Sequence, residues 1–427
     1  LEESMDFQLD LLQKQAVEET LTKGVVVVTG GPGTGKTTTI NLMIRCFEME
    51  KMDIVLAAPT GRAAKRMTEA TGYEAKTIHR LLEVSGGIED GDSSHFEKNE
   101  DNPIEADAVI LDEMSMVDIH LMYSLLKAIV PGTRLILVGD SNQLPSVGPG
   151  NVLKDIIDSK AFSVVRLSKI YRQAESSHIV LNAHKINAGE LITLDNKNKD
   201  FFFFEKKDVR SVMGALVYLV KTRLPEYIGA SPFEIQVLTP MRKGELGVEH
   251  LNEVLQYYLN PASESKKEKE GRTGVFREGD KVMQVKNNYK LEWKITNAKG
   301  FSIEEGLGVF NGDMGIIKQI NTYSERITVV FDENREAEYP FSSLDELELA
   351  YAITIHKSQG SEYPAVVLPL LSGPPILCNR NLLYTAITRA QKCVAIAGRQ
   401  SMVEQMIHNE TEQKRYSGLN DCLKEGL

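Results

Sequence analysis

Short apolar runs alternate with segments of helical periodicity along the first third of the chain. Five runs rich in β-branched residues have the length of a strand: Val25–Thr29, Ile54–Ala58, Ala108–Asp112, Arg134–Gly139 and Val164–Leu167. Strands that alternate with helices build a parallel sheet covered by helices. We therefore expect a first α/β domain over residues 1–168.

The same alternation of apolar runs and helical segments returns further along the chain, with one interruption. A helical pattern covers Leu246–Leu259. Strand-length apolar runs are found at Ile235–Thr239, Ala350–Ile355, Ala365–Leu370 and Val394–Ala397. These elements predict a second α/β domain made of residues 169–270 and 346–427.

Residues 271–345 have a different pattern, with short strands separated by turn signals. Asn311 and Gly312 form a typical turn dipeptide. Strands are expected at Lys281–Val285, Gly315–Ile320, Ile327–Asp332 and Glu336–Phe341. This pattern predicts a small β-barrel inserted into the second domain.

The composition describes a chain that folds and is not anchored in a membrane. Of its 427 residues, 42% are hydrophobic and 26% charged, which excludes a mainly disordered protein. The longest apolar runs fall far short of the roughly 20 residues that span a bilayer. Four widely spaced cysteines indicate a reducing compartment without a disulfide framework. Because the chain begins at Leu1 without a methionine, we expect it to be part of a longer protein.

The net charge of −11 argues, by itself, against a nucleic-acid partner. Its distribution changes that inference, because acids outnumber bases by seven within residues 89–107 alone. Between Ala58 and Arg80 bases exceed acids by three, which fits either a nucleic-acid contact or a solvated helix face. The acidic stretch lies in residues 84–107, which we expect to form an inserted hairpin or loop.

The strongest local motif is GGPGTGKT, Gly30–Thr37, directly after an apolar strand and before a helical run. It matches the phosphate-binding pattern GxxxxGK[ST] in the strand–loop–helix context that the pattern requires. Glycines let backbone N–H groups surround phosphate oxygens, and the helix N-terminus adds partial positive charge. The residues expected to bind nucleotide here are Gly31, Pro32, Gly33, Thr34, Gly35, Lys36, Thr37 and Thr38.

A carboxylate pair, Asp112 and Glu113, follows the apolar run that starts at Ala108. Asp112 and the Thr37 hydroxyl are suited to bind Mg²⁺, and Glu113 is suited to act as the base or to orient the attacking water. Such a pair is often plain solvation of a strand end. Together with the phosphate loop, it predicts an ATP·Mg²⁺ site in which Lys36 contacts the β- and γ-phosphates.

Nine motifs in register now resemble a known family. They are LLQKQAV (11–17), GGPGTGKT (30–37), APTGRAAKRM (58–67), TIHRLL (77–82), DEMSMVD (112–118), LVGDSNQLPSVGPG (137–150), IYRQ (170–173), TIHKSQGSEY (354–363) and YTAITRA (384–390). This set is similar to superfamily 1 helicases, most closely to the RecD-like branch, the RecD/TraA family of bacterial DNA helicases. The stretches LTPMRKGELGVEHLN (238–252) and FNGDMG (310–315) support that branch.

The resemblance implies roles for further residues around the nucleotide. Gln13 resembles the glutamine that reads the adenine edge, and Tyr171 the aromatic residue that stacks on adenine. Gln143 matches the sensor of the γ-phosphate. Arg172 and Arg389 match two arginine fingers, and Gly360 and Glu362 lie in the segment that binds the ribose. The implied fold has two RecA-like parallel-sheet motor domains with ATP between them, a small β-hairpin insertion that splits the duplex, and an SH3-like β-barrel insertion.

The resemblance also implies a track for one strand of DNA. Hydroxyls, backbone amides and a few cations grip phosphates without reading bases. In the first domain the implied contacts are Pro59, Thr60, Gly61, Arg62, Lys65, Thr77 and His79. In the second they are Arg242, Lys243, Thr354, His356, Lys357 and Ser358.

The expected function is an ATP-dependent helicase that moves 5′ to 3′ along single-stranded DNA and unwinds forks in repair or recombination. The direction follows from the resemblance alone. The implied protein is a bacterial, cytoplasmic, nucleoid-associated and monomeric motor, with protein partners unknown. Two alternatives stay open: an RNA or mixed-substrate helicase of the same superfamily, and a DNA-dependent ATPase subunit of a larger complex.

Overall fold

The computed structural model describes residues 9–83, 96–171, 176–272, 274–297, 301–411 and 415–426. By its internal contacts the chain divides into two units. Unit 1 comprises residues 1–188 and 412–427, and unit 2 comprises residues 189–411.

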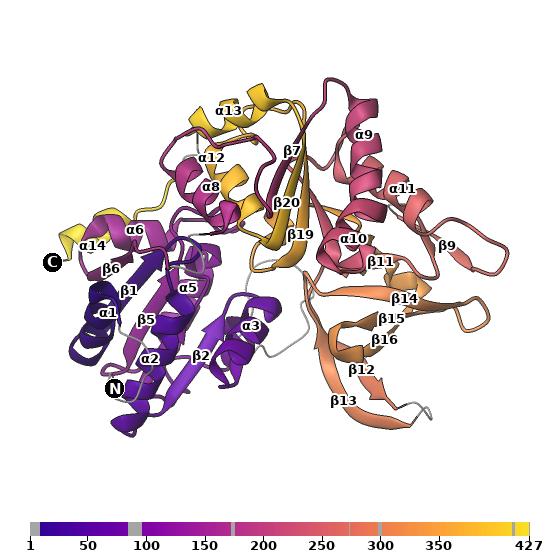
Figure 1. The fold of residues 1–427 in the computed structure, drawn as a ribbon. Helices are drawn as coiled ribbons and strands as arrows, with labels where there is room; N and C mark the ends of the chain where they lie inside the picture. The colour runs from indigo at the N-terminus through magenta and orange to yellow at the C-terminus, as the bar shows by residue number, and fades with distance from the viewer. Residues whose placement is uncertain are drawn as a thin grey trace. The chain divides into compact units, whose positions relative to one another are not determined.

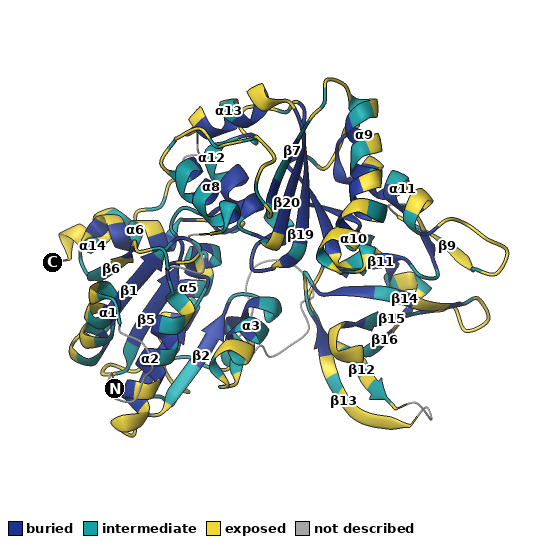
Figure 2. Cartoon of the chain, viewed as in Figure 1, coloured by how far each residue is buried: buried dark blue, intermediate teal, exposed yellow. Residues whose placement is uncertain are grey.

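Unit 1 is built on a six-stranded parallel sheet with the order β3-β2-β4-β5-β1-β6. Its strands are β1 (Val25–Gly30), β2 (Ile54–Ala58), β3 (Ala75–Thr77), β4 (Ala108–Leu111), β5 (Arg134–Gly139) and β6 (Ser163–Leu167). The five strands that the sequence predicts here are all present, with ends that agree within one residue. The buried interiors of these strands are visible in Figure 2.

Helices cover both faces of this sheet. The helices are α1 (Leu11–Thr22), α2 (Lys36–Met49), α3 (Gly61–Thr71), α4 (Ile78–Leu81), α5 (Ile119–Ala128), α6 (Val152–Ser159), α8 (His178–Asn187) and α14 (Leu419–Glu425), with a short 3₁₀ turn at Met114–Met116. One face packs against α1, α2 and α3 through residues such as Ala16, Phe47 and Met67. The other packs against α4, α5 and α6, with Leu419 and Leu423 of α14 at its margin.

Alternation along each strand explains the two cores. In β1, Val26 and Val28 face one helical layer while Val27 faces the other. A strand buried on both faces therefore shows as an unbroken apolar run in the sequence.

Unit 2 contains a second parallel sheet with the order β18-β8-β19-β20-β7. Its strands are β7 (Phe201–Glu205), β8 (Ile235–Thr239), β18 (Ala352–Thr354), β19 (Tyr363–Leu370) and β20 (Ala390–Gly398). The helices of this unit are α9 (Val209–Tyr218), a π-helical turn (Leu219–Arg223), α10 (Leu224–Ile228), α11 (Val248–Leu259), α12 (Arg380–Ile387) and α13 (Gln400–His408). The edge strand β7, a run of four phenylalanines, was not among the predicted strands.

An antiparallel module interrupts this second sheet in the sequence, as predicted. Its seven-stranded sheet has the order β13-β12-β16-β15-β14-β11-β17. The strands are β11 (Lys281–Gln284), β12 (Asn288–Thr296), β13 (Ser302–Val309), β14 (Met314–Asn321), β15 (Arg326–Phe331), β16 (Glu336–Pro340) and β17 (Leu347–Leu349), next to a separate ribbon of β9 (Glu268–Gly271) and β10 (Gly274–Arg277). The long β12–β13 hairpin reaches away from the rest of this sheet (Figure 1).

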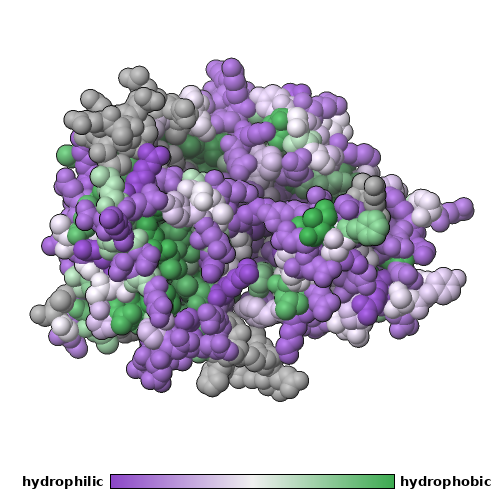
Figure 3. All heavy atoms as spheres, turned by 90° about the horizontal axis from the view of Figure 1, so that it is seen from below, coloured by the Kyte–Doolittle hydropathy of each residue, from purple (hydrophilic) through white to green (hydrophobic). Residues whose placement is uncertain are grey.

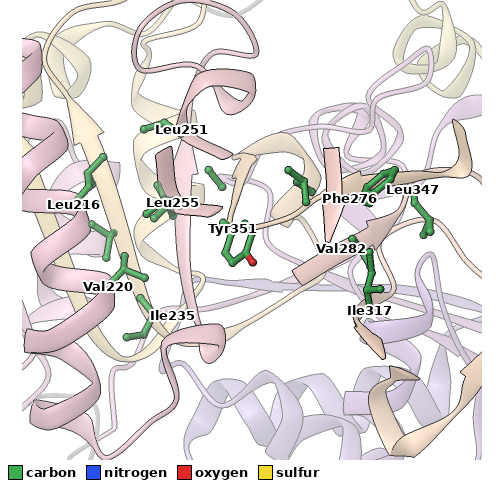
Figure 4. Packing of buried hydrophobic residues seen from close by; sticks show 14 of the residues in the cluster. Leu216, Val220, Ile235, Leu251, Leu255, Phe276, Val282, Ile317, Leu347 and Tyr351 are labelled. Carbon is green, nitrogen blue, oxygen red and sulfur yellow. The ribbon is translucent and has the colours of Figure 1, made fainter. Parts of the chain in front are cut away.

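The parallel sheet and the antiparallel module of unit 2 share one core. Leu216 of α9 and Leu255 of α11 belong to the same cluster of buried side chains as Val282 of β11 and Ile317 of β14 (Figure 4). Close-packed side chains resist relative movement, so this shared core holds the antiparallel module firmly against the second sheet.

Two segments group differently from the predicted domain ranges, which stay predictions. Helix α8 and residues 415–426 belong to unit 1, although both lie in the range predicted for the second α/β domain. Apolar packing of α14 on α6 accounts for the second of these placements. Of the predicted hairpin at 84–107, residues 84–95 lie outside the described residues.

The outside of the chain is mostly polar on the face drawn in Figure 3, where hydrophobic residues form separate patches. Among the described residues, no helix is both long enough and apolar enough to cross a membrane.

One buried carboxylate links three parts of unit 2. Asp280, with no exposed surface, accepts hydrogen bonds from Gln256 and Asn260 of the α11 region, at 2.6 and 2.7 Å, and from the Tyr351 hydroxyl at 2.9 Å. It also accepts from the Arg277 backbone N–H at 2.7 Å. Burial raises the pKa of Asp280, which shows how little water reaches it.

We expect Asp280→Ala to destabilise unit 2 by roughly 3 kcal/mol or more, because buried donors are left without an acceptor. Trp293, the single tryptophan of the chain, lies in unit 2 and supplies the fluorescence signal for denaturant unfolding. Glu264→Ala, at an exposed position, is the control and should unfold like the parent. A parent-like midpoint for Asp280→Ala would contradict the role of this network.

Candidate nucleotide site and strand contacts

The loop between β1 and α2 has the shape of a phosphate cradle. Gly33 and Gly35 have φ angles of 73° and 79°, a left-handed conformation that glycine adopts without a steric penalty. The Lys36 ammonium donates to the carbonyls of Gly30, at 2.6 Å, and Gly31, at 3.1 Å. Lys36 is therefore held across the loop, where phosphate oxygens would meet it.

The remaining loop residues frame the start of α2. The Thr34 hydroxyl donates to the Gly31 carbonyl at 2.8 Å and closes the loop on itself. Thr37, in the first turn of α2, is exposed, and Thr38 is half-buried. The Pro32 carbonyl lies 3.2 Å from Nε2 of His184 on α8, so a helix remote in sequence supports the loop.

Gln13 and Tyr171, which were predicted to contact adenine, converge on Gly35. A β-carbon on Gly35 would lie 2.9 Å from both Gln13 Nε2 and Tyr171 Cε2. Gln13 is 2% exposed, and its Oε1 accepts the Asp10 N–H at 3.4 Å within the N-terminal cap of α1. Within the described part of the chain, Gln13 Nε2 and the Tyr171 hydroxyl have no hydrogen-bond partner. These buried polar atoms are therefore available to a ligand.

The carboxylate pair lies at the carboxyl end of β4, and β5 separates this strand from β1, which leads into the phosphate loop. Burial, and then the neighbouring Glu113, raise the pKa of Asp112 to about 6, against the opposing effects of Lys36 and Arg66. Glu113 has a left-handed backbone, with φ 54° and ψ 40°, which is uncommon for a residue with a side chain. Strained backbone of this kind is often found at functional sites.

An ion pair at this edge was not predicted from the sequence. Nη2 of Arg66, on α3, donates to Oε1 of Glu113 at 2.7 Å. The sequence pattern placed Arg66 only among the bases of a mildly basic segment. Its partner is 47 positions away, and the pairing depends on how α3 packs against the sheet.

Gln143 follows β5 at the same edge and is 8% exposed. Its Oε1 has no hydrogen-bond partner in the part of the chain that the structure describes. Arg415, from the C-terminal segment of unit 1, donates to the carbonyls of Gly148 and Gly150, the latter at 2.9 Å. Arg415, which was not predicted, therefore holds the loop that follows Gln143, the residue predicted to sense the γ-phosphate.

The strand contacts predicted in unit 1 gather at the starts of α3 and α4. Thr60 caps α3 by accepting the Ala63 N–H, and Thr77 caps α4 by accepting the Arg80 N–H. Pro59, Gly61, Arg62 and Lys65 precede or form the first turns of α3.

His79, predicted on the same track, lies on α4. Its ring is tilted against Phe96, with 6.0 Å between centroids. Burial lowers the pKa of His79, which favours a neutral imidazole.

In unit 2, the structure brings the predicted residues Gly360, Glu362 and Arg389 together. Arg389 is 2% exposed, and its guanidinium donates to the carbonyls of Thr385 and Ser361. Glu362 is exposed and accepts a hydrogen bond from Gln391 at 3.3 Å. Arg172, the other predicted arginine finger, lies outside the described residues.

Two predicted strand contacts of unit 2 share one carboxylate. Glu348 of β17 accepts from Arg242 at 2.7 Å and from Lys357 at 2.9 Å. Burial raises the pKa of Glu348, but the two cations outweigh it and leave the pKa below its usual value. Arg242 also lies 3.4 Å from Glu249.

The other predicted contacts of unit 2 lie around this group. Lys243 is exposed beside Arg242, and His356 lies in the short 3₁₀ turn that also holds Lys357. The Thr354 hydroxyl accepts the Lys357 N–H at 3.3 Å. Ser358 is fully buried and donates to the Ile355 carbonyl, so its side chain has an internal partner.

Three family models match successive parts of the chain. An AAA domain matches residues 13–149, an "ATP-dependent RecD-like DNA helicase SH3 domain" matches residues 251–331, and a "UvrD-like helicase C-terminal domain" matches residues 349–397. The first contains the phosphate loop and the carboxylate pair, and the second overlaps the antiparallel module.

Curated relatives agree with these models. The chain is 31% identical over 445 residues to the RecBCD enzyme subunit RecD of Mycolicibacterium smegmatis, covering 96% of this chain and 74% of that protein. It is 32% identical to the RecBCD enzyme subunit RecD of Mycobacterium tuberculosis, over 92% of this chain and 70% of that protein. The chain belongs to the RecD-like helicase family.

Two further comparisons show how much of each related protein this chain matches. The RecD-like chain is 37% identical over 374 residues to the ATP-dependent RecD2 DNA helicase of Deinococcus radiodurans, which covers 88% of this chain but only 47% of that protein. The chain thus spans about half the length of that relative. A Bacteroides Pif1 helicase solved with ADP-AlF3 and single-stranded DNA has a TM-score of 0.53 at 20% identity, over 94% of each chain. The likeness to this Pif1 structure shows that the two chains share a fold with two RecA-like domains.

We expect Gly35→Ala to weaken nucleotide binding about tenfold or more. The left-handed backbone would be strained by about 1–3 kcal/mol, and the new methyl group would displace Gln13 and Tyr171. Titration with a fluorescent ATP analogue measures the effect. Gly24→Ala, where no atom lies within 4 Å of the new β-carbon, should bind like the parent. Equal affinity in the two variants would contradict the assigned adenine side of the site.

Proposed function

We propose that this chain is the ATP-driven motor of a DNA helicase that moves 5′ to 3′ along one strand and unwinds duplexes at forks. The observation that carries the proposal is the meeting of Lys36, Asp112, Glu113 and Gln143 at one edge of the first sheet, beside the capped helix starts that hold Thr60 and Thr77. The same unit thus supplies both a hydrolysis site and phosphate-gripping groups. Membership of the RecD-like family supports the helicase assignment.

Each nucleotide-site residue has a defined task in this proposal. Lys36 leaves the loop carbonyls for the β- and γ-phosphates, and the loop N–H groups and the α2 N-terminus hold the remaining charge. Glu113 orients the attacking water, and Gln143 contacts the γ-phosphate. Gln13 reads the adenine edge with its amide, and Tyr171 stacks on the ring.

The donor set fits a Mg²⁺ ion. Thr37 is exposed in the first turn of α2, and the Asp112 carboxyl, at the end of β4, is close enough to Lys36 for its charge to lower the pKa of Asp112. A hydroxyl and a carboxylate are the oxygen ligands that Mg²⁺ takes beside nucleotide phosphates. Bound there, the ion would neutralise phosphate charge that develops during hydrolysis.

Unit 2 contributes the charges that respond to nucleotide and strand. We assign Arg389, with Arg172, to the transferring phosphoryl group, because a planar guanidinium that stays protonated suits spread negative charge. Gly360 and Glu362 are assigned to the ribose. Arg242, Lys243, Thr354, His356 and Lys357 are assigned to the strand, whereas the buried hydroxyl of Ser358 stabilises the turn that holds Lys357.

A second assignment has support from the curated relatives. The Mycolicibacterium and Mycobacterium proteins are subunits of an enzyme complex. The chain would then be a DNA-dependent ATPase within a larger assembly rather than a monomeric motor. In either case we place it in the bacterial cytoplasm, acting on chromosomal DNA, in repair or recombination.

The decisive test is directional unwinding by the chain alone. Duplexes with a 5′ or a 3′ single-stranded tail, each labelled with a fluorophore and quencher, are supplied with ATP and Mg²⁺. We expect strand separation only with the 5′ tail, and roughly 10²-fold or greater loss of ATP hydrolysis in Lys36→Ala. Activity on the 3′ tail alone would reverse the direction, whereas DNA-stimulated hydrolysis without unwinding would favour the subunit. Stronger stimulation by RNA oligomers would favour the RNA helicase.

The shared carboxylate of unit 2 predicts opposite effects on strand binding. Lys357→Ala removes a cation, so single-stranded DNA should bind more weakly, with a salt slope lower by about 0.7. Glu348→Gln removes the competing anion and should strengthen binding. Lys221→Ala, at an exposed position, is the matched control. Fluorescence anisotropy at several salt concentrations measures both, and an unchanged slope in Lys357→Ala would remove that residue from the track.

A further inference from the structure

Arg66 and Glu113 are in contact, although the proposed function places Glu113 at the attacking water and the helix of Arg66 at the strand. Glu113 stands directly after Asp112 and is the residue assigned to the attacking water. Arg66 stands on α3, whose first turns carry the assigned strand contacts. The guanidinium Nη2 lies 2.7 Å from Oε1 of Glu113, and the two side chains are 29% and 11% exposed. Both residues lie in unit 1.

The pairing is a firm restraint. An ion pair with so little exposure is only weakly screened by water, and separating it leaves a poorly solvated charge on each side. Charge-assisted hydrogen bonds of this length are among the stronger ones in proteins. The backbone at Glu113 is held in the left-handed region at the same point. The carboxylate is thereby turned toward α3, with one oxygen engaged by Arg66.

The helix connects this restraint with the strand. Arg62 and Arg66 are four positions apart, so their side chains lie on the same face of α3. Ala63, Ala64 and Met67 are buried and hold the opposite side of the helix to the sheet. A phosphate bound beside Arg62 and the Thr60 cap therefore lies one helical turn from Arg66. That phosphate is a second anion that the Arg66 guanidinium can bind in place of Glu113.

We propose that Arg66 is a positioning residue that restrains Glu113 while no strand is bound, and that a DNA phosphate at the start of α3 competes for Arg66 and frees Glu113 for hydrolysis. This inference rests on the proposed function and deepens it. It gives a physical route by which strand occupancy sets the rate of ATP hydrolysis. The restraint limits ATP hydrolysis by a motor that has no DNA strand bound.

The test compares ATP hydrolysis by the full chain without DNA and with saturating oligo(dT). For Arg66→Ala we expect the DNA-free kcat to rise about tenfold, while the DNA-bound kcat changes little, so that the stimulation by DNA collapses. Arg66→Lys, which keeps the charge but not the guanidinium fork, should lie between the variant and the parent. Arg45→Ala, an exposed arginine on α2, is the control and should keep the stimulation of the parent.

Two outcomes would overturn the inference. A fall of kcat both with and without DNA in Arg66→Ala would mean that Arg66 holds Glu113 in its working position. An unchanged ratio of the two rates would mean that the pair has no part in the response to DNA. Thermal unfolding and binding of a fluorescent ATP analogue verify that each variant is folded, and Arg66→Gln, which keeps a neutral donor to Glu113, provides the readout if Arg66→Ala does not fold.

Lys36→Ala separates a failure of this inference from a failure of the proposed function. If Lys36→Ala hydrolyses ATP as fast as the parent, the phosphate loop is not the hydrolysis site and the proposed function itself fails. If Lys36→Ala is inactive and Arg66→Ala keeps the stimulation of the parent, only the role of Arg66 fails.

Discussion

Charged side chains crowd the carboxyl edge of the first sheet, where little water is present to screen them. Parallel strands all end at this edge, so the phosphate loop after β1 and the carboxylates after β4 lie on the same side of the sheet, separated by β5. Burial, and then the adjacent Glu113, raise the pKa of Asp112, and the charges of Lys36 and Arg66 oppose that rise. The surrounding fold keeps these charges in place, and in the proposed function nucleotide phosphates replace the carbonyl partners of Lys36 while a strand phosphate competes with Glu113 for Arg66.

In unit 2 the charges are arranged the other way round, with two cations around one carboxylate. Glu348 holds Arg242 and Lys357 together in the absence of a phosphate, which places two cations side by side at little cost in repulsion. Asp280 fixes the antiparallel module to the second sheet through buried hydrogen bonds. In the proposed function, Arg242 and Lys357 exchange Glu348 for strand phosphates, while the buried hydrogen bonds of Asp280 stay in place.

Much of the fold could be predicted because its central strands are buried on both faces. Such strands appear as unbroken apolar runs, and β2 and β5 were predicted with their observed ends. The β12–β13 hairpin was not among the predicted strands, although Tyr289, Leu291, Trp293 and Ile295 alternate with polar residues along β12. Edge strand β7 was missed because a short aromatic run does not distinguish a strand from a buried helix.

Sequence by itself predicted the phosphate loop and the carboxylate pair, because each is a local pattern whose chemistry follows from residue type and spacing. The sensor role of Gln143 was predicted from the family resemblance alone. Tertiary structure alone decided the partners of these groups. Arg66 meets Glu113 from 47 positions away, and Arg415 fixes the Gln143 loop from the far end of the chain. Such pairings depend on how helices pack over a sheet, and neither periodicity nor a short motif encodes that geometry.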